Sequence, residues 1–125
     1  RLNDLAILLN NQGKYDQAKP LYERAIKIGE TALGPEHSDV GIRLHDLAYL
    51  LSNQGKYDEA KPLYERAIAI GTKALGPEHA GIGRMLNNLA LLLVNQGKYD
   101  EAKPLYERAI AIGEKAIGTE HSDAG

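Results

Sequence analysis

The chain has 125 residues but no cysteine, tryptophan or phenylalanine, and only one methionine. Without cysteine it has neither disulfide bonds nor thiolate ligands for a metal ion. No run of apolar residues approaches the length of a membrane-spanning helix, and no signal peptide is evident. We therefore expect a soluble, cytoplasmic protein that does not interact with a membrane.

An excess of charge of one sign is also lacking, because 15 lysines and arginines stand against 17 aspartates and glutamates. Nucleic-acid-binding domains normally carry a basic patch or stripe. A chain with nearly balanced charge also attracts a strongly charged partner only weakly at long range. The balance argues against a nucleic acid as the partner.

Residues arranged for catalysis are missing as well. Serine is scarce, and none of Ser38, Ser52 and Ser122 lies in the sequence context of a catalytic nucleophile. No glycine-rich segment has the spacing of a phosphate-binding loop. Because no pair of nucleophile and base can be assembled, we predict that the protein is not an enzyme and needs no cofactor.

The sequence instead contains an internal repeat. The hexapeptide Asn-Gln-Gly-Lys-Tyr-Asp begins at Asn11, Asn53 and Asn95, which gives a period of 42 residues. The first two units are identical at 31 of 42 aligned positions. Such periods are typical of solenoid proteins, in which each unit buries its apolar face against its neighbours. We predict one array with repeats 1–42, 43–84 and 85–125.

Each repeat has the pattern of two helices, which we name helix A and helix B. In the second repeat, helical spacing of apolar residues continues to Gln54, and Gly55 then predicts a turn. The next helical pattern begins near Tyr57 and ends before Gly76-Pro77, since proline cannot continue a helix. The predicted buried residues are Leu44, Leu47, Ala48 and Leu51 in helix A, and Tyr57, Ala60, Tyr64, Ala67, Gly71, Ala74 and Leu75 in helix B.

Helix B carries two further signals. Gly71 lies in its middle at a cost of about 1 kcal/mol relative to alanine, and glycine recurs at the equivalent Gly29 and Gly113. We interpret this small residue on the buried stripe as a point where two helices approach closely. In the third repeat Thr119 replaces the proline after Gly118, and we expect helix B to end there too.

The order of large, small and aromatic residues resembles the tetratricopeptide repeat. In the second repeat this motif reads Leu44, Leu47-Ala48, Leu51, Gly55, Tyr57, Ala60, Tyr64 and Ala67. The 42-residue unit, with Gly-Pro-Glu-His at its end and Leu-Asn-Asn-Leu-Ala in the third helix A, is similar to the kinesin light chain type. The resemblance implies an all-α, right-handed solenoid of three antiparallel helix pairs, with helix A on the concave wall.

The resemblance also implies a protein–protein interaction module that binds a peptide segment of another protein along the concave wall. Kinesin light chains are known for cargo peptides in which a tryptophan is flanked by acidic residues. Such ligands need basic residues in the groove, and only Arg84 is a clear candidate here. Ile42 stands where kinesin light chains tend to carry lysine. The preference for acidic peptides therefore transfers poorly to this chain.

Comparison of the repeats locates the variable surface. Helix B is nearly identical in all three copies, whereas helix A varies on the side opposite its buried stripe. We call this surface the helix A face and predict that it binds the peptide; the alternative is that an exposed surface has drifted without selection. Its residues are Asn3, Asp4, Ile7, Asn10, Ile42, His45, Asp46, Tyr49, Ser52, Arg84, Asn87, Asn88, Leu91 and Val94.

Tyr49 is the one tyrosine without a counterpart in the other repeats, which have Ile7 and Leu91 at the equivalent position. A tyrosine at the centre of a groove is a typical binding anchor. Packing of Tyr49 on a neighbouring helix A is an equally open interpretation. The asparagine side chains of the helix A face offer both donor and acceptor groups to a peptide main chain.

Three of the four histidines, His37, His79 and His121, share one repeat position. Equivalent residues of adjacent repeats lie too far apart to share one ion, so we predict no metal site. We expect these histidines to act at the start of a helix. His45 and Asp46 are not expected to form a dyad, because neighbouring helical residues point in different directions.

Two functions from different classes remain open. The first is a peptide-binding adaptor, and the second is a structural or self-assembling scaffold, natural or consensus-engineered, without a specific ligand. We also expect chains to stack head to tail through apolar residues at the two ends of the array, a contact that does not close into a ring. These residues are Leu105, Ile110 and Ile112 at one end and Leu2, Leu5 and Leu9 at the other.

Overall fold

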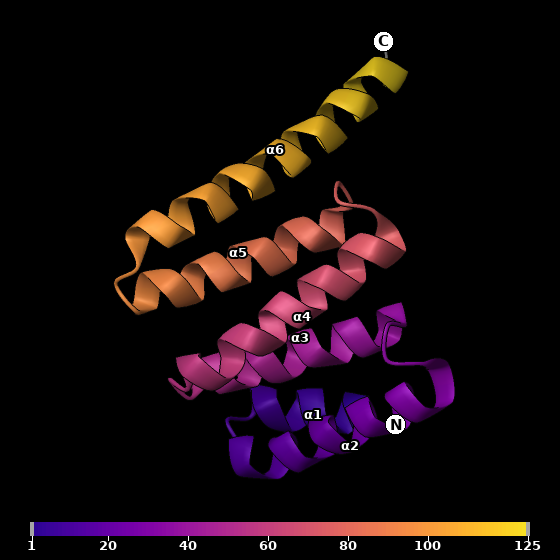
Figure 1. Cartoon of the computed structure of the whole chain (residues 1–125), viewed down its shortest axis with the longest axis vertical. Coiled ribbons are helices and arrows are strands. Elements are labelled where there is room, and N and C mark those ends of the chain that lie inside the picture. Colours follow the sequence, from indigo (N-terminus) through magenta and orange to yellow (C-terminus); the bar gives the residue numbers. More distant parts are fainter. Residues whose placement is uncertain (1, 125) are drawn as a thin grey trace.

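In the computed structural model, the chain forms six helices arranged as three antiparallel pairs that stack along one axis (Figure 1). The structure describes the backbone of residues 2–124 and the side chains of residues 2–116. Over this backbone no strand is present, so the predicted all-α class is confirmed. The helices are α1 (Leu2–Asn11), α2 (Tyr15–Leu33), α3 (Ser38–Asn53), α4 (Tyr57–Leu75), α5 (Ala80–Asn95) and α6 (Tyr99–Ala124).

A glycine in the left-handed conformation separates helix A from helix B in every repeat. Gly55 has a φ angle of +77°, which costs little only when the β-carbon is missing. Its N–H donates to the Ser52 carbonyl at 3.0 Å, and the N–H of Lys56 donates to the Leu51 carbonyl at 2.8 Å. These bonds satisfy carbonyl groups at the end of α3, and α4 then begins at Tyr57 as predicted.

The core lies between the apolar stripes of the two helices of each pair. The four predicted positions of α3 are all buried, as are the predicted residues of α4 up to Gly71, apart from the half-buried Tyr57. The prediction was wrong for Ala74 and Leu75, which are exposed in the last turn of α4 beside an exposed loop. Ile70 is buried instead, because it packs against Gly41 at the start of α3.

Successive pairs approach each other most closely at the glycine of helix B. A β-carbon on Gly71 would lie 2.7 Å from Ile82 Cδ1, and one on Gly29 would lie 2.7 Å from the Arg43 guanidinium. Both distances are too short for a carbon atom, so glycine is what lets the next helix A pack here. The interpretation of this glycine as a point of close approach is confirmed.

The last helix differs from the prediction. α6 continues through Gly118 to Ala124, whereas the other two helices B end before a Gly-Pro pair. Thr119 keeps the backbone N–H that a proline lacks, so it permits the helix to continue. The backbone of His121 therefore lies inside a helix rather than at a helix start, and its side chain lies outside the described residues.

Two matched substitutions test the close approach. Gly113→Ala places a methyl group where nothing lies within 4 Å, so it should raise the free energy of unfolding by about 0.5–1 kcal/mol through helix propensity. Gly71→Ala gains the same propensity but must displace Ile82, at a cost of about 1–3 kcal/mol. Urea unfolding followed by circular dichroism should rank Gly71→Ala clearly below Gly113→Ala. Equal effects would contradict the packing argument.

Candidate functional site

The helix A face extends over α1, α3 and α5, and each of these helices packs beside the next. Seven of the predicted residues are exposed: Asp4, Ile7, Ile42, Tyr49, Arg84, Asn87 and Leu91. Five are partly buried: Asn3, Asp46, Ser52, Asn88 and Val94. The remaining two, Asn10 and His45, are buried, so in this structure they lie beneath the face rather than on it.

Side-chain hydrogen bonds join the face from one repeat to the next. The amide of Asn3 donates to the Asp46 carboxylate over 3.4 Å, and the amide of Asn88 lies 2.9 Å from His45 Nε2. Both bonds join the same two repeat positions on adjacent helices A. Two of the asparagines that we expected to offer to a peptide are therefore already bonded to the protein, while Asn87 remains exposed.

Two buried tyrosines lie beneath these bonds. Burial raises the pKa of Tyr22 to about 12, helped by the negative charge of Asp46 and opposed by a hydrogen bond from Asn10. The pKa of Tyr64 is raised too, first by burial and then by Tyr49 and Asp46. The negative charge of Asp46 thus helps to raise the pKa of a buried tyrosine in each of two repeats.

His45 packs against this cluster without forming a catalytic pair. Its ring lies 5.4 Å from the ring of Tyr64 at an interplanar angle of 60°. Its Nδ1 lies 3.9 Å from Asp46 Oδ1, closer than the sequence argument allowed but beyond hydrogen-bond length. The expectation that these neighbours point apart was too strict, although they share no hydrogen bond.

The histidines in the loops between repeats accept hydrogen bonds from the backbone. His37 Nδ1 accepts a hydrogen bond from the N–H of Asp39 at 3.1 Å, and His79 Nδ1 accepts one from the N–H of Gly81 at 3.0 Å. Each caps the start of a helix A, as predicted. No group of three or more metal-ligating side chains occurs among the residues whose side chains are described.

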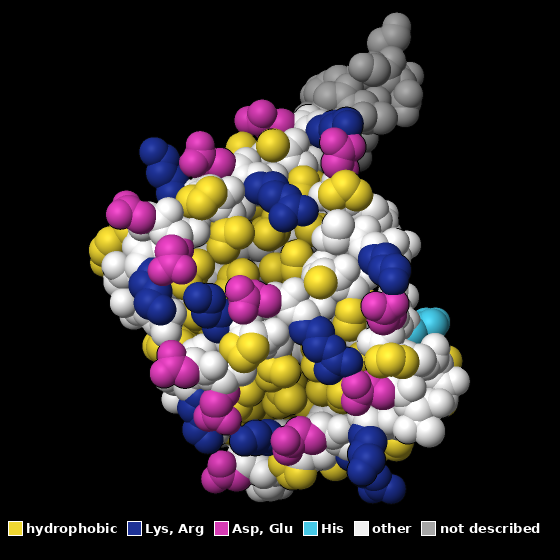
Figure 2. All heavy atoms as spheres, viewed as in Figure 1, with side chains coloured by type: hydrophobic (Ala, Val, Ile, Leu, Met, Phe, Trp, Pro, Cys, Tyr) yellow, Lys and Arg dark blue, Asp and Glu magenta, His cyan; other side chains and the backbone are white. Residues whose placement is uncertain are grey.

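An apolar row crosses the helix A face. Ile7, Tyr49 and Leu91 occupy the same position on the three successive helices A and are 37%, 44% and 50% exposed. In the view of Figure 2, basic and acidic side chains are interspersed around apolar patches that lie in hollows of the surface. The row therefore offers three apolar side chains at regular spacing to a ligand.

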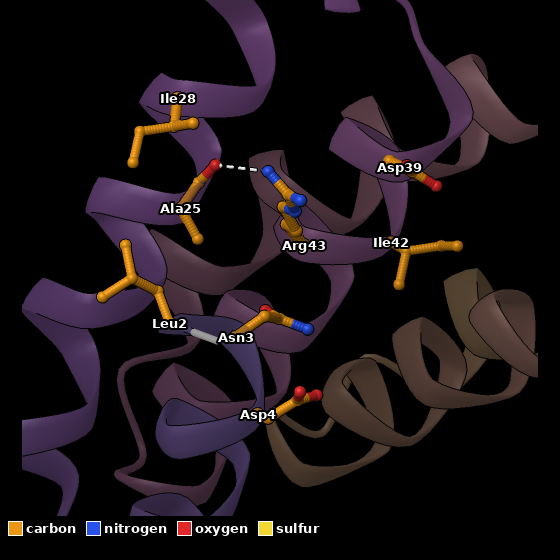
Figure 3. Close-up of a pocket in the computed structure, with 8 residues that line it drawn as sticks. All are labelled: Leu2, Asn3, Asp4, Ala25, Ile28, Asp39, Ile42 and Arg43. Atoms are coloured by element: carbon orange, nitrogen blue, oxygen red, sulfur yellow. Dashed lines mark hydrogen bonds between the residues drawn. The ribbon is translucent and has the colours of Figure 1, made fainter. Parts of the chain in front are cut away.

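A pocket of about 470 Å³ opens at the α1 end of the face (Figure 3). Three of the predicted residues, Asn3, Asp4 and Ile42, contribute to its wall. The Arg43 guanidinium donates to the Ala25 carbonyl at 2.7 Å, so that cation is already engaged (Figure 3). The complete lining is Leu2, Asn3, Asp4, Ala25, Ile28, Asp39, Ile42 and Arg43.

Comparison with known proteins identifies the array. A model of the tetratricopeptide repeat matches residues 2–73 and again 42–115, which together span most of the chain. The chain belongs to the tetratricopeptide repeat family. Members of this family are generally non-catalytic and mediate protein–protein interaction or scaffolding. No curated protein sequence matches the chain significantly.

Solved structures show the same solenoid. The tetratricopeptide repeat array is similar to a putative kinesin light chain from Podosopora anserina with nearly identical repeats, at 30% identity and a TM-score of 0.82 over 92% of this chain and 55% of that chain. It is also similar to BtubC (BKLC) from P. vanneervenii, at 28% identity and a TM-score of 0.86 over 91% of this chain and 45% of that chain. The array is thus of the kinesin light chain type and spans about half the length of these relatives. Of the helices described, none is both long and apolar enough to cross a bilayer.

Sequence comparison of the repeats missed the residues beneath the face. Tyr22 and Tyr64 are identical in the repeat, so variation did not mark them, yet their hydroxyl groups sense the charge of Asp46. Ile28 was missed for a similar reason. Its equivalents Ile70 and Ile112 are buried, and only in the first repeat does this isoleucine reach the pocket.

Alkaline unfolding tests the buried tyrosines. Because the pKa of Tyr22 is raised from 10.0 to about 12 in the folded protein, its contribution to stability is complete below pH 10 and lost as the pH rises toward 12. Urea unfolding between these pH values should show a smaller loss for Tyr22→Phe than for the unchanged protein. Tyr99→Phe, at an exposed position, serves as the control. If Tyr22→Phe lost as much stability between these pH values as the unchanged protein, the raised pKa of Tyr22 would be contradicted.

Proposed function

We propose that the tetratricopeptide repeat array is an adaptor that binds a peptide segment of another protein on the helix A face. The exposed row of Ile7, Tyr49 and Leu91 is the observation that carries the proposal. Each of these three side chains is more than a third exposed at the same repeat position, so a large part of its apolar surface is left uncovered. It suits a ligand that runs across the repeats.

The spacing of the row indicates the form of the peptide. Packed helices lie about 8–10 Å apart, and three residues of a polyproline II helix advance about 9 Å while returning to the same side. A peptide with an apolar residue at every third position would therefore meet the row repeatedly. A cytoplasmic location belongs to this proposal, supported by the similarity to a putative kinesin light chain.

Substitution of Tyr49 tests the adaptor function. A peptide library screened against the 125-residue chain should yield ligands whose binding weakens by about 2 kcal/mol in Tyr49→Ala. Helicity should stay unchanged because this side chain is 44% exposed and lies outside the core. Tyr99→Ala, which removes an exposed tyrosine from helix B, is the matched control.

Two results would argue against this site. Binding that survives Tyr49→Ala but is lost on substitution of Lys61 or Glu65 would move the ligand to helix B on the outer wall. Absence of any peptide ligand would favour a scaffold without a specific ligand.

A second candidate function, self-assembly, is favoured by the two ends of the stack. Leu5 is 47% exposed, whereas the equivalent Leu47 and Leu89 are each 5% exposed beneath a preceding repeat. At the other end Ile110 is 58% exposed, whereas Ile26 is 7% exposed. The same residues that pack between repeats inside the chain are thus uncovered at its two ends. We propose that one chain stacks on the next through these surfaces.

The residues predicted to be uncovered at the two ends are exposed or partly exposed, with one exception. Ile112 is buried because its side chain packs against Gly83 of α5 within the same helix pair. It was wrongly assigned to the exposed end. The other predicted residues, Leu2, Leu5, Leu9, Leu105 and Ile110, are exposed or partly exposed.

An ion pair inside the chain indicates which charges would meet at such a junction. Glu30 on α2 accepts from Arg66 on α4 at 2.7 Å. The glutamate recurs in the last repeat as Glu114, and the arginine recurs in the first repeat as Arg24. Stacking in the register of the internal repeats would pair Glu114 of one chain with Arg24 of the next.

Charge reversal tests this register. Arg24→Glu and Glu114→Arg each place like charges at the junction, so each alone should weaken self-association about fivefold in sedimentation experiments. An equimolar mixture of the two variants should associate as well as the unchanged protein, because opposite charges meet again. A chain that stays monomeric at all concentrations would rule out stacking. Self-association that neither charge reversal weakens would rule out the pairing of Glu114 with Arg24 but not stacking itself.

A further inference from the structure

Hydrogen-bond acceptors are in excess where α1 faces α3 on the helix A face. The Asp46 side chain is 24% exposed and carries a negative charge on this part of the face. The Oδ1 atom of Asn3 is buried and accepts no hydrogen bond from the described residues. The amide of Asn3 also lies against the Asp46 carboxylate, so two oxygen-bearing groups lie together with few donors between them.

The donors near Asp46 do not balance its charge. Asn3 reaches the carboxylate only over 3.4 Å, a long hydrogen bond, and His45 Nδ1 remains 3.9 Å away. Arg43, a cation on the same helix, is used by the Ala25 carbonyl. Among the described side chains no lysine or arginine forms an ion pair with Asp46. A partly buried carboxylate of this kind favours a cation from outside.

The neighbouring tyrosines report the same negative potential. Asp46 opposes ionisation of the hydroxyl groups of both Tyr22 and Tyr64, which belong to two different repeats. Tyr49 lies three residues beyond Asp46 on α3, so both side chains occupy one side of the helix. The exposed ring of Tyr49 is itself attractive to a cation over its face.

We infer that Asp46 and Tyr49, backed by the acceptor group of Asn3, form a site for an arginine side chain of the bound peptide. The planar guanidinium carries five donors, which suits a site with several oxygen acceptors and an aromatic ring better than the compact ammonium of lysine does. This inference rests on the proposed peptide-binding function and names the residue class that the second repeat selects. It makes the face selective for basic rather than acidic peptides.

The test uses a probe that is independent of any peptide. N-acetyl-arginine methylamide is titrated into the isotopically labelled chain, and its neutral citrulline counterpart is titrated in parallel. The arginine probe should shift the amide signals of Asp46 and Tyr49 saturably, whereas the citrulline probe should shift them at least about tenfold less at equal concentration. Added salt should weaken the arginine response. Equal shifts with both probes, or none at these residues, would overturn the inference.

Two variants assign the response to its residues. Asp46→Asn removes the charge but installs the residue that the third repeat already carries at this position, Asn88, so the fold should be kept. It should weaken the arginine response about tenfold. Asp100→Asn makes the same change of net charge on exposed α6 and should leave the response unchanged. An equal loss in both variants would reduce the effect to net charge and overturn the site.

The peptide screen separates this inference from the adaptor function. Ligands that depend on Tyr49 and are enriched in arginine support both proposals. Ligands that depend on Tyr49 but show no preference for arginine would overturn the cation site and leave the adaptor function standing. A response to the arginine probe at Asp46, together with no peptide ligand at all, would overturn the adaptor function alone.

Discussion

The packing of each helix B against the helix A that follows is the contact on which the rest of the molecule depends. A single pair of helices cannot bury both of its apolar sides, so each pair needs a neighbour. Gly29 and Gly71 permit this contact, because a β-carbon at either position would lie 2.7 Å from a side-chain atom of the next helix A. The same packing occurs at both junctions, so the three helices A come to lie side by side as one surface.

That constraint separates the residues that pack from the residues free to vary. Helix B contacts helix A of its own repeat and of the next. Helix A has one side outside these contacts, and there the repeats differ, as at Ile7, Tyr49 and Leu91. A surface of this kind can change its chemistry without changing the packing beneath it.

The helix bounds could be predicted from the sequence because the residues that end each helix act through their own backbone geometry. Gly55 and Gly76-Pro77 act through backbone geometry, which needs no knowledge of the neighbours. The errors arose where the outcome depends on neighbours. Leu75 follows the helical pattern but has no partner at the end of α4, and His45 lies on the variable side yet is buried by contacts with Tyr64 and Asn88. A helical wheel shows which side of a helix a residue occupies but not which neighbouring residues pack against that side.

The repeat position of Asp46 shows how place in the stack changes chemistry. Asp4 is the same residue at the same position of the first repeat, yet it is exposed, whereas Asp46 is three-quarters buried. Of these two aspartates, only Asp46 has a helix A before it, which brings Asn3 close. Burial weakens the screening of a charge by water, so the same carboxylate acts more strongly at 46 than at 4. Recognition by this array therefore depends on neighbouring repeats as much as on the residue itself.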